Sequence, residues 1–361
     1  MALTTTTETS PAHPPAVAAT SCGDGRAASA SHPRLVADIG GTNARFGWIA
    51  SPGAPVSDVR TLPVPAHAGP AEAAQQYLAD LAAAQGAAWR APRHAAFAVA
   101  TAVAGDRVAF TNSHWDFSRE AVRRALGLEQ LLMLNDFEAL ALSLPCLGAD
   151  QLRCPDGRLP HAAGAAPGLL AVVGPGTGLG VGAVVHTRQG WVALPGEGGH
   201  ATLAAGDDLE AAVIAAVRRR YPHVSAERLL SGIGLPLLHQ ALGEVRGQAP
   251  ATPWTAEAIV NAALGGQDAL ADGTLDLFCA LLGSFAGNVA LTLGARGGVY
   301  IGGGIVPRFA DRFFASAFRP RFEAKGRFQG YLAGIPTALI TDTLAALSGG
   351  ALAIEQQVAL G

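Results

Sequence analysis

Residues 35–49 read LVADIGGTNARFGWI, an apolar strand that runs into a glycine-rich turn and out into a second strand. Residues 169–185 repeat this arrangement as LLAVVGPGTGLGVGAVV. In each turn, consecutive backbone N–H groups and a threonine hydroxyl are available to an anion, and the glycines carry no side chain that would block close approach. Two such turns on two lobes can hold the phosphates of a nucleotide from opposite sides. The pair therefore predicts a phosphate-transferring enzyme.

The composition sets the class of protein. The chain has 361 residues, of which 50% are hydrophobic and 15% charged, and its formal net charge is −3. These values predict a globular protein of two domains without the basic surface that binds nucleic acid. No apolar segment of about 18 residues is free of Gly and Pro, so no membrane span is predicted. The cysteines have neither CxxC nor metal-ligand spacing, which favours a reducing cytoplasm; they are Cys22, Cys146, Cys154 and Cys279.

The order of elements predicts an α/β protein. Residues 1–33 lack apolar periodicity and are expected to form a disordered tail without a catalytic role. Further strands are predicted at 95–104, 131–134, 191–194, 299–301 and 336–341, and helices at 71–85, 118–127, 138–144, 207–220, 273–294 and 344–359. Residues 148–167 read as a long loop that marks a domain crossing. The alternation predicts mainly parallel sheets, with functional groups at the C-terminal ends of the strands.

The first glycine-rich turn contains a carboxylate. Asp38 lies two residues before Gly40 at the end of its strand, where it either caps the turn by accepting backbone N–H bonds or holds Mg²⁺ through water. Thr42, Asn43 and Arg45 favour the metal, because a magnesium–nucleotide needs an acidic partner and hydrogen-bond donors together. Neither this turn nor the second one matches a P-loop or a GxGxxG turn, since both join strand to strand.

The second and third glycine clusters are less specific. Residues 174–178 read GPGTG and could simply permit close packing of the strands. Residues 302–304 read GGG after a buried strand and before a helix whose first turn accepts Pro307. Flat backbone of this kind can lie against a nucleoside, and tight packing of strand on helix is the alternative.

One carboxylate follows a buried strand directly. Asp136, in the sequence Asn135-Asp136-Phe137, stands at a strand's C-terminal end, where active sites collect. It is either an ordinary helix N-cap or the group that receives a hydroxyl proton in phosphoryl transfer.

Other polar residues fit a sugar. Glu197 and His200 lie in the glycine-rich segment LPGEGGH, and Glu227 lies in SAER. Separately, His200 could be an ordinary loop histidine and Glu227 a surface helix residue. Together with Asn112, Asn135 and Asp136 they are the planar donors and acceptors that sugar hydroxyls require, because each hydroxyl both donates and accepts.

In these motifs and their order, the chain from Arg34 onward resembles the bacterial glucokinases of the hexokinase-type group within the actin-like ATPase superfamily. The resemblance implies an α/β, two-lobed actin-like ATPase (ribonuclease H-like) fold with a mixed sheet in each lobe and a central cleft. The small lobe would comprise residues 34–146 together with a C-terminal helix at 342–361, and the large lobe residues 147–341. The cysteine-rich zinc motif of the related repressor/ORF/kinase group is absent from the sequence, which argues against membership there.

The resemblance also implies a reaction and its residues. The reaction is ATP-dependent phosphorylation of D-glucose at O6 in the cytoplasm by a homodimer, with ATP and Mg²⁺ as cofactors. Asp136 corresponds to the catalytic base, and Asn112, Asn135, Asp136, Glu197, His200 and Glu227 to the sugar-binding set. The residues that correspond to the nucleotide site are Ala37, Asp38, Ile39, Gly40, Gly41, Thr42, Asn43, Arg45, Gly176, Thr177, Gly178, Gly302, Gly303 and Gly304, with Asp38 holding Mg²⁺ through water.

Three alternatives stay open at this point. The substrate could be another hexose, such as fructose, mannose or an amino sugar, and the phosphate donor could be polyphosphate. A non-catalytic sugar-responsive regulator is a third reading. It is disfavoured because residues 1–33 are too short and too poor in periodic hydrophobics for a helix-turn-helix, and because Asp136 is intact.

Overall fold

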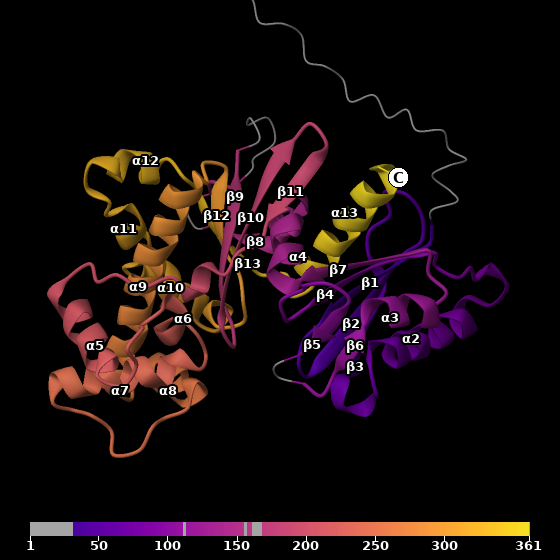
Figure 1. Cartoon of the computed structure of the whole chain (residues 1–361). Helices are drawn as coiled ribbons and strands as arrows, with labels where there is room; N and C mark the ends of the chain where they lie inside the picture. Colours follow the sequence, from indigo (N-terminus) through magenta and orange to yellow (C-terminus); the bar gives the residue numbers. More distant parts are fainter. Residues whose placement is uncertain (1–31, 111–112, 155–156, 161–167, 361) are drawn as a thin grey trace, which may run out of the picture.

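The computed structural model describes residues 32–110, 113–154, 157–160 and 168–360. Of the predicted tail, residues 1–31 lie outside the described part. Two mixed β-sheets lie side by side, and Figure 1 shows helices α4 (Asp136–Ser143) and α13 (Ala345–Leu360) between them. The predicted α/β class with a mixed sheet on each side is confirmed.

The first sheet has the strand order β3-β2-β1-β4-β7. Its strands are β1 (Arg34–Ile39), β2 (Asn43–Ile49), β3 (Ser57–Pro63), β4 (His94–Val99) and β7 (Gln130–Asn135). β1, β4 and β7 are parallel, and their register aligns Ile39 with Val99 and Val99 with Asn135. The turn after β1 and the Asn135-Asp136 pair therefore lie on the same edge of this sheet. A small hairpin, β5 (Arg107–Ala109) and β6 (Asp116–Ser118), follows β4 in the chain.

The second sheet has the strand order β11-β10-β9-β12-β13-β8. Its strands are β8 (Leu152–Arg153), β9 (Leu170–Pro175), β10 (Leu179–Thr187), β11 (Gly190–Leu194), β12 (Gly298–Ile301) and β13 (Thr337–Ile340). β9 and β12 are parallel, with Val173 opposite Ile301. The glycine-rich turns at 176–178 and 302–304, which follow these two strands, are therefore neighbours on one edge.

Both faces of each sheet are covered by helices. In β1, Leu35 and Ile39 belong to the core that includes α2 (Pro70–Gln85) and α3 (Arg119–Ala125), whereas Val36 packs with Leu347 of α13 on the other face. Burial on both faces explains why this strand is apolar throughout. The second sheet packs on α4 and, through the largest core, on a group of helices: α5 (Asp208–Arg218), α6 (Ala226–Leu229), α7 (Gly234–Arg246), α8 (Ala256–Leu264), α9 (Ala269–Leu293), α10 (Ala310–Ala315), α11 (Phe318–Glu323) and α12 (Gln329–Ala333).

Helix α9 is the central helix of that core. Asp268 caps its N-terminus by accepting the N–H of Ala271, and Gly294 ends it in a left-handed conformation. By length and composition α9 could cross a membrane, but 72% of its most apolar window is buried inside the protein. Its apolar character is thus explained by the core that it fills.

Several predicted elements need correction. The expectation of mainly parallel sheets is wrong, because β1–β2, β2–β3, β9–β10, β10–β11 and β8–β13 are all antiparallel. The predicted strand at 95–104 ends at Val99, where the chain turns away so that Thr101 C=O accepts a hydrogen bond from Asn135 Nδ2. The predicted loop at 148–167 contains β8, which is too short to have a sequence pattern.

Candidate active site

The first glycine-rich turn is closed by its own backbone. Gly40 N–H donates to Asn43 C=O at 2.9 Å, so the turn does not need Asp38 as its cap. Instead, the antiparallel register places Asp38 opposite Arg45, and the Asp38 carboxylate accepts a hydrogen bond from Arg45 Nη1 at 3.1 Å. Burial raises the pKa of Asp38 and the Arg45 charge opposes that rise. The carboxylate is held at the edge of the sheet with one cationic partner.

The other residues predicted for this turn divide into two kinds. Thr42 and Asn43 are exposed and available to a ligand. Ala37 and Ile39 have fully buried side chains in the core, so their side chains support the turn from below and any contact with a nucleotide would come from their backbone.

Asn135 is the N-cap of α4. Its Oδ1 accepts the N–H of Phe137 at 2.9 Å, and its Nδ2 donates to Thr101 C=O at 3.2 Å. The side chain is thus fixed at both ends, and one N–H of the amide stays available for a sugar hydroxyl. Asn135 therefore caps α4, so the helix N-cap that the sequence analysis allowed for Asp136 falls on the preceding residue.

Asp136 is the first residue of α4, and its Oδ1 also accepts the N–H of Phe137 at 2.9 Å. Burial raises the pKa of this carboxyl to about 6; the Phe137 N–H lowers it, and the charges of Asp38 and Glu197 raise it further. These three carboxylates come from β1, α4 and the segment after β11, and they are close enough for their charges to interact. Acidic groups from the segments of both sheets therefore act on the charge of Asp136, which marks the site.

The loop at residues 197–200 is tied to α6. Its 3-10 turn spans Gly198–His200, and Ala226 N–H donates to Ala201 C=O at 2.9 Å just beyond it. His200 Nδ1 lies 3.8 Å from Glu227 Oε1, with the imidazole 60% and the carboxylate 33% exposed. Glu197 is also exposed. The predicted residues Glu197, His200 and Glu227 thus belong to two segments that the fold fastens together.

The second glycine-rich turn, at 176–178, lies directly beside Glu227. Glu227 Oε2 accepts the N–H of Leu179 at 2.9 Å, and a Cβ atom on Gly178 would overlap this carboxylate. A Cβ on Gly176, in contrast, would meet no atom within 4 Å. Gly178 is therefore required for packing, whereas Gly176 faces open space that a phosphate could enter.

The third cluster, at 302–304, packs against the second turn. Gly303 has φ of +76°, and a Cβ there would collide with Pro175 C=O. Gly304 has nothing within 4 Å of its hypothetical Cβ. The packing interpretation holds for Gly303, while Gly304 offers bare backbone beside the turn at 176–178, as a nucleoside contact requires.

Phe137 joins the two sheets, which the sequence reading did not foresee. A Cβ on Gly174 or on Gly180 would overlap the Phe137 ring, and one on Gly182 would lie 2.8 Å from Phe137 C=O. The glycines of β9 and β10 therefore leave the space in which Phe137, the residue that follows Asp136, packs. The alternation of glycine along LGVGAVV at 179–185 was the available signal, but it does not say which side chain fills the space.

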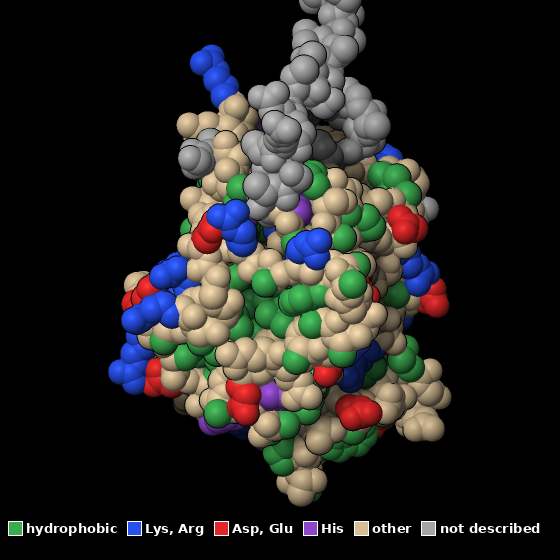
Figure 2. Space-filling view, turned by 90° about the vertical axis from the view of Figure 1, so that its right-hand side faces the viewer, with side chains coloured by type: hydrophobic (Ala, Val, Ile, Leu, Met, Phe, Trp, Pro, Cys, Tyr) green, Lys and Arg blue, Asp and Glu red, His purple; other side chains and the backbone are tan. Residues whose placement is uncertain are grey.

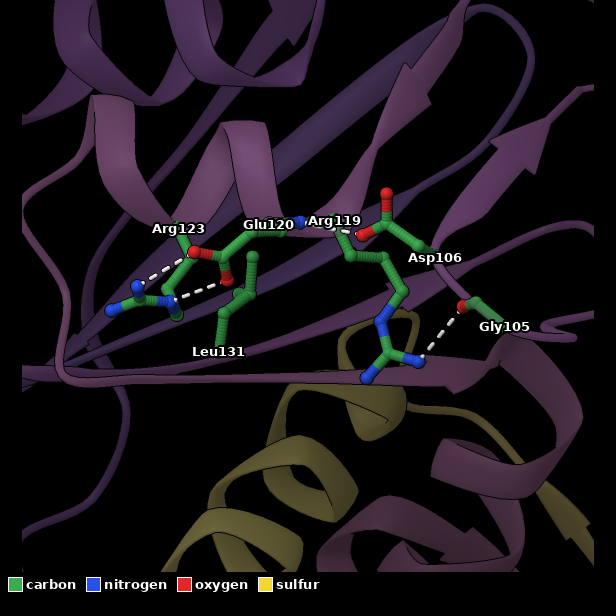
Figure 3. A pocket seen from close by; sticks show the side chains of 6 residues that line it. All are labelled: Gly105, Asp106, Arg119, Glu120, Arg123 and Leu131. Carbon is green, nitrogen blue, oxygen red and sulfur yellow. Dashed lines mark hydrogen bonds and ion pairs between the residues drawn. The ribbon is translucent and has the colours of Figure 1, made fainter.

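Some predicted or possible sites fall elsewhere. Asn112 lies outside the described residues. A hollow of about 230 Å³ lies beside α3, and none of the predicted residues lines it (Figure 3). Charged side chains in this hollow pair with each other, as Arg123 does with Glu120. The residues that line it are Gly105, Asp106, Arg119, Glu120, Arg123 and Leu131. Within the described part of the chain no three His, Cys, Asp or Glu side chains form a metal cage.

The surface charge is mixed on the face that the first sheet presents. Figure 2 shows basic and acidic side chains interspersed around an apolar centre, with no single-sign field among the described residues of that face. The positions of the charged groups thus do not set up a long-range field there.

Comparisons with known proteins converge on one family. The glucokinase family model matches residues 35–357. The chain is 49% identical to a glucokinase of Aromatoleum aromaticum over 331 residues, which cover 92% of this chain and 97% of the relative. It is 46% identical to a glucokinase of Neisseria meningitidis (strain MC58), with 91% and 97% covered.

Solved structures agree. The crystal structure of a glucokinase from an Antarctic psychrotroph has a TM-score of 0.80 and 37% sequence identity, and the match covers 90% of this chain and 98% of that one. A ROK hexokinase from Thermus thermophilus shares the fold with a TM-score of 0.64 at 19% identity, covering 91% and 100%.

Proposed function

Because the chain belongs to the glucokinase family, it is an ATP-dependent kinase that converts D-glucose to glucose 6-phosphate, and we propose that Asp136 is its general base. The observation that carries this assignment is the place of Asp136 directly after β7, beside the aligned strand ends of β4 and of β1, which carries Asp38. The charges of Asp38 and Glu197 both act on Asp136 there. Of the three, Asp136 stands at a helix N-terminus and has a pKa of about 6. It is thus ionised at neutral pH and still basic enough to take a proton in the transition state.

Phosphoryl transfer requires little covalent chemistry from the protein itself. The O6 hydroxyl gives its proton to the Asp136 carboxylate as O6 forms a bond to the γ-phosphorus, and the bond from that phosphorus to the β–γ bridging oxygen breaks to release ADP. Since this transition state is largely dissociative, the position of Asp136 matters more than its basicity. Asn135 supports that position by capping α4 and by holding Thr101 C=O.

We assign the sugar contacts to Asn112, Asn135, Glu197, His200 and Glu227. Support comes from the bond that fastens the loop at 197–200 to α6, from the exposure of Glu197 and His200, and from the action of the Glu197 charge on Asp136. A site with these residues discriminates between sugars, because an analogue that lacks one hydroxyl leaves a polar side chain of the site without a hydrogen-bond partner.

We assign the phosphates of ATP to the two turns, at 38–45 and 176–178, and the nucleoside to Gly302–Gly304. The acidic groups fit a divalent cation held through water, because the interacting charges of Asp38 and Asp136 are offset by the single guanidinium of Arg45. Mg²⁺ bound there would neutralise charge on the γ-phosphoryl group. Asp38 would hold its hydration shell, and the turn N–H groups would orient the phosphates.

We further propose the lobe boundaries given by the sequence, namely 34–146 with the helix at 342–361 against 147–341, and a cytoplasmic homodimer. The packing of α13 on β1, β4 and α4 supports the return of the last helix to the first lobe. Cys146 and Cys279 are free thiols, as a reducing compartment would leave them. Light scattering on the purified protein measures the subunit number directly.

The substrate assignment predicts a clear order of sugars. In a coupled assay for ADP release with Mg-ATP, glucose is expected to support the fastest turnover among glucose, mannose, fructose, glucosamine and N-acetylglucosamine. Faster turnover of another sugar would change the substrate assigned to the enzyme and leave the proposed mechanism unchanged. Polyphosphate in place of ATP tests the donor in the same assay, and the expected result is no product.

The pKa of Asp136 predicts the acid limb of the pH profile. Because the base must be ionised and this pKa belongs to the protein without substrate, kcat/KM for glucose is expected to fall as the pH drops through about 6, by about tenfold for each further unit. The check is kcat/KM for glucose from pH 5 to 8 at saturating Mg-ATP. A profile that stays flat down to pH 5 would contradict the role of Asp136.

Replacing Glu197 by glutamine separates binding from chemistry. The loss of a charged acceptor for a sugar hydroxyl is expected to raise the KM for glucose by about 10–100-fold, with a smaller effect on kcat. Since the Glu197 charge helps to raise the pKa of Asp136, the acid limb of the profile should also move to lower pH. Glu257→Gln on α8 is the matched control, and an unchanged KM in Glu197→Gln would make Glu197 structural.

A further inference from the structure

Lys325 is the only lysine of the chain, because all the others of its 25 lysines and arginines are arginines. An arginine keeps its proton in proteins, whereas a lysine amine can lose it and react as a nucleophile. Lys325 follows α11, and its aliphatic stem packs on α9, where a Cβ on Gly287 would lie 2.8 Å from Lys325 Cε. The single side-chain amine of the protein is therefore held against the central helix of the larger core.

The end of this side chain lines a hollow of about 300 Å³ between α9, α11 and the segment before α5. Lys325 Nζ donates to Ser284 C=O at 2.9 Å. Asn288 adds an amide to the lining, and three further residues present methyl groups, namely Ala204, Ala205 and Ala324. Asn288 and the three alanines are exposed, so the hollow can be entered from solvent.

Arg321 lines the same hollow and takes the acidic partners there. Its Nη1 donates to Asp207 Oδ2 at 3.2 Å, and its Nη2 pairs with the fully buried carboxylate of Glu210. Burial lowers the pKa of Lys325, the charge of Arg321 lowers it further, and the charge of Glu210 opposes the shift. The neutral amine, whose lone pair is the nucleophile, is therefore more populated here than on an open surface.

We propose that Lys325 is an acyl-acceptor site, which takes a small acyl group such as acetyl from an acyl phosphate or an acyl thioester. The hollow suits the product, because the alanines offer apolar contacts to the acyl chain and the Asn288 amide offers a donor to its carbonyl oxygen. The acylated Nζ keeps one N–H for Ser284 C=O. The site is separate from the kinase reaction, since none of the residues assigned to sugar or nucleotide lines the hollow.

The transfer balances without a further reagent. The lone pair of the neutral Nζ attacks the acyl carbon, and the new N–C bond forms. The bond from that carbon to the phosphate oxygen, or to the thioester sulfur, breaks, and its electron pair leaves with the phosphate or the thiolate. The proton lost from Nζ passes to the leaving group or to water.

The test follows the rate at which Lys325 is acetylated. The full-length protein is incubated at pH 7.5 with acetyl phosphate in one arm and acetyl-coenzyme A in the other, and peptide mass spectrometry locates the acetyl groups. We expect Lys325 to react at least about threefold faster in the folded protein than in the same chain unfolded in urea, because the neutral fraction of an amine rises about tenfold for each unit by which its pKa falls. Faster reaction in either arm supports the proposal and identifies the donor. A rate no higher than in the unfolded chain in both arms would overturn it.

Ala204→Leu tests the hollow itself, because the larger side chain narrows the space into which the acyl group must enter. We expect it to slow acetylation of Lys325 at least about threefold by obstructing the approach of the donor. The other primary amine of the chain, at its N-terminus, should react as in the wild type. Ala84→Leu, on the exposed side of α2, is the matched control and should leave both rates unchanged. An unchanged rate at Lys325 in Ala204→Leu would refute the proposal.

The stability of the acetylated protein gives a second readout. Because the fold lowers the pKa of Lys325, it disfavours the charged form, and acetylation removes that charge. The Tm of the acetylated protein at pH 7.5 is therefore expected to equal or exceed that of the unmodified protein. Lys325→Arg, treated in the same way, cannot be acetylated at this position and corrects for modification of the N-terminal amine. A Tm lowered by acetylation in the wild type alone would show that the acyl group does not fit the hollow, and the proposal would fail.

Discussion

Replacing Asp136 by asparagine is expected to lower kcat by about 10²–10⁴-fold while the protein stays folded and binds glucose. Asparagine has nearly the same shape, and its Oδ1 can still accept the Phe137 N–H that Asp136 accepts at 2.9 Å. What it lacks is the ability to take the O6 proton. The measurement is kcat with saturating glucose and Mg-ATP, together with the Kd for glucose, and turnover near that of the wild type would rule out Asp136 as the base.

The same variant should gain stability. The folded state raises the pKa of Asp136 from 3.8 to about 6, so it disfavours the ionised form relative to the unfolded chain. Above about pH 6 the charge therefore costs the fold on the order of 1–3 kcal/mol, and this cost disappears as the pH falls below about 4. Asp136→Asn is thus expected to melt a few degrees higher than the wild type at pH 7.5 and equally at pH 4. A lower Tm at pH 7.5 would contradict the burial of this charge.

Replacing Gly180 by alanine is the second change with a large expected effect. Its Cβ would overlap the Phe137 ring, and the strand backbone of β10 cannot withdraw without breaking its pairing with β9. Overpacking of this kind costs about 1–3 kcal/mol of stability. Since Phe137 follows Asp136 directly, a displacement of the ring moves the base, and a shift of about 1 Å can cost about 10²-fold in rate.

Two companion variants test the cause. Gly176→Ala meets open space, so its Tm should match the wild type while the KM for ATP rises, because the new methyl group occupies the predicted phosphate position. Phe137→Leu combined with Gly180→Ala should recover part of the lost stability, since the overlap is relieved, and a double-mutant cycle of Tm and kcat measures that recovery. Wild-type Tm and kcat in Gly180→Ala would show that the ring is free to move.

The strands that carry the site could be predicted from the sequence because their apolar runs are bounded by glycine. The turn at residues 40–43 and the strand ending before Asp136 lie where the pattern placed them. β3 was missed because its side chains are mostly exposed at the sheet edge, so its residues read as a polar connection. Helices α7 and α8 were missed: α7 has no side-chain cap at its N-terminus and contains Pro236 and Gly243, and α8 has only nine residues.

The candidate site was predicted as a set of residue types and not as an arrangement. Glu227 was recognised as a carboxylate that suits a sugar, but its bond to Leu179 depends on a contact between two segments distant in the chain. Gly174 was interpreted as a phosphate-binding or packing residue and Gly180 was given no role of its own, and only the position of Phe137 shows that both pack. Sequence patterns report on neighbours along the chain, whereas these contacts are set by how the two sheets meet.

The position of α13 at the end of the chain has a consequence for folding during synthesis on the ribosome. α13 covers β1 and β4 and packs along α4, yet it is synthesised after the whole of the second sheet. About 200 residues separate α4 from α13, which corresponds to roughly 10–40 s of translation. During that interval Val36 and Ala96 lack the apolar partners Leu347 and Ile354. The nascent first sheet therefore exposes an uncovered apolar face, a natural place for a chaperone to bind until the last helix arrives.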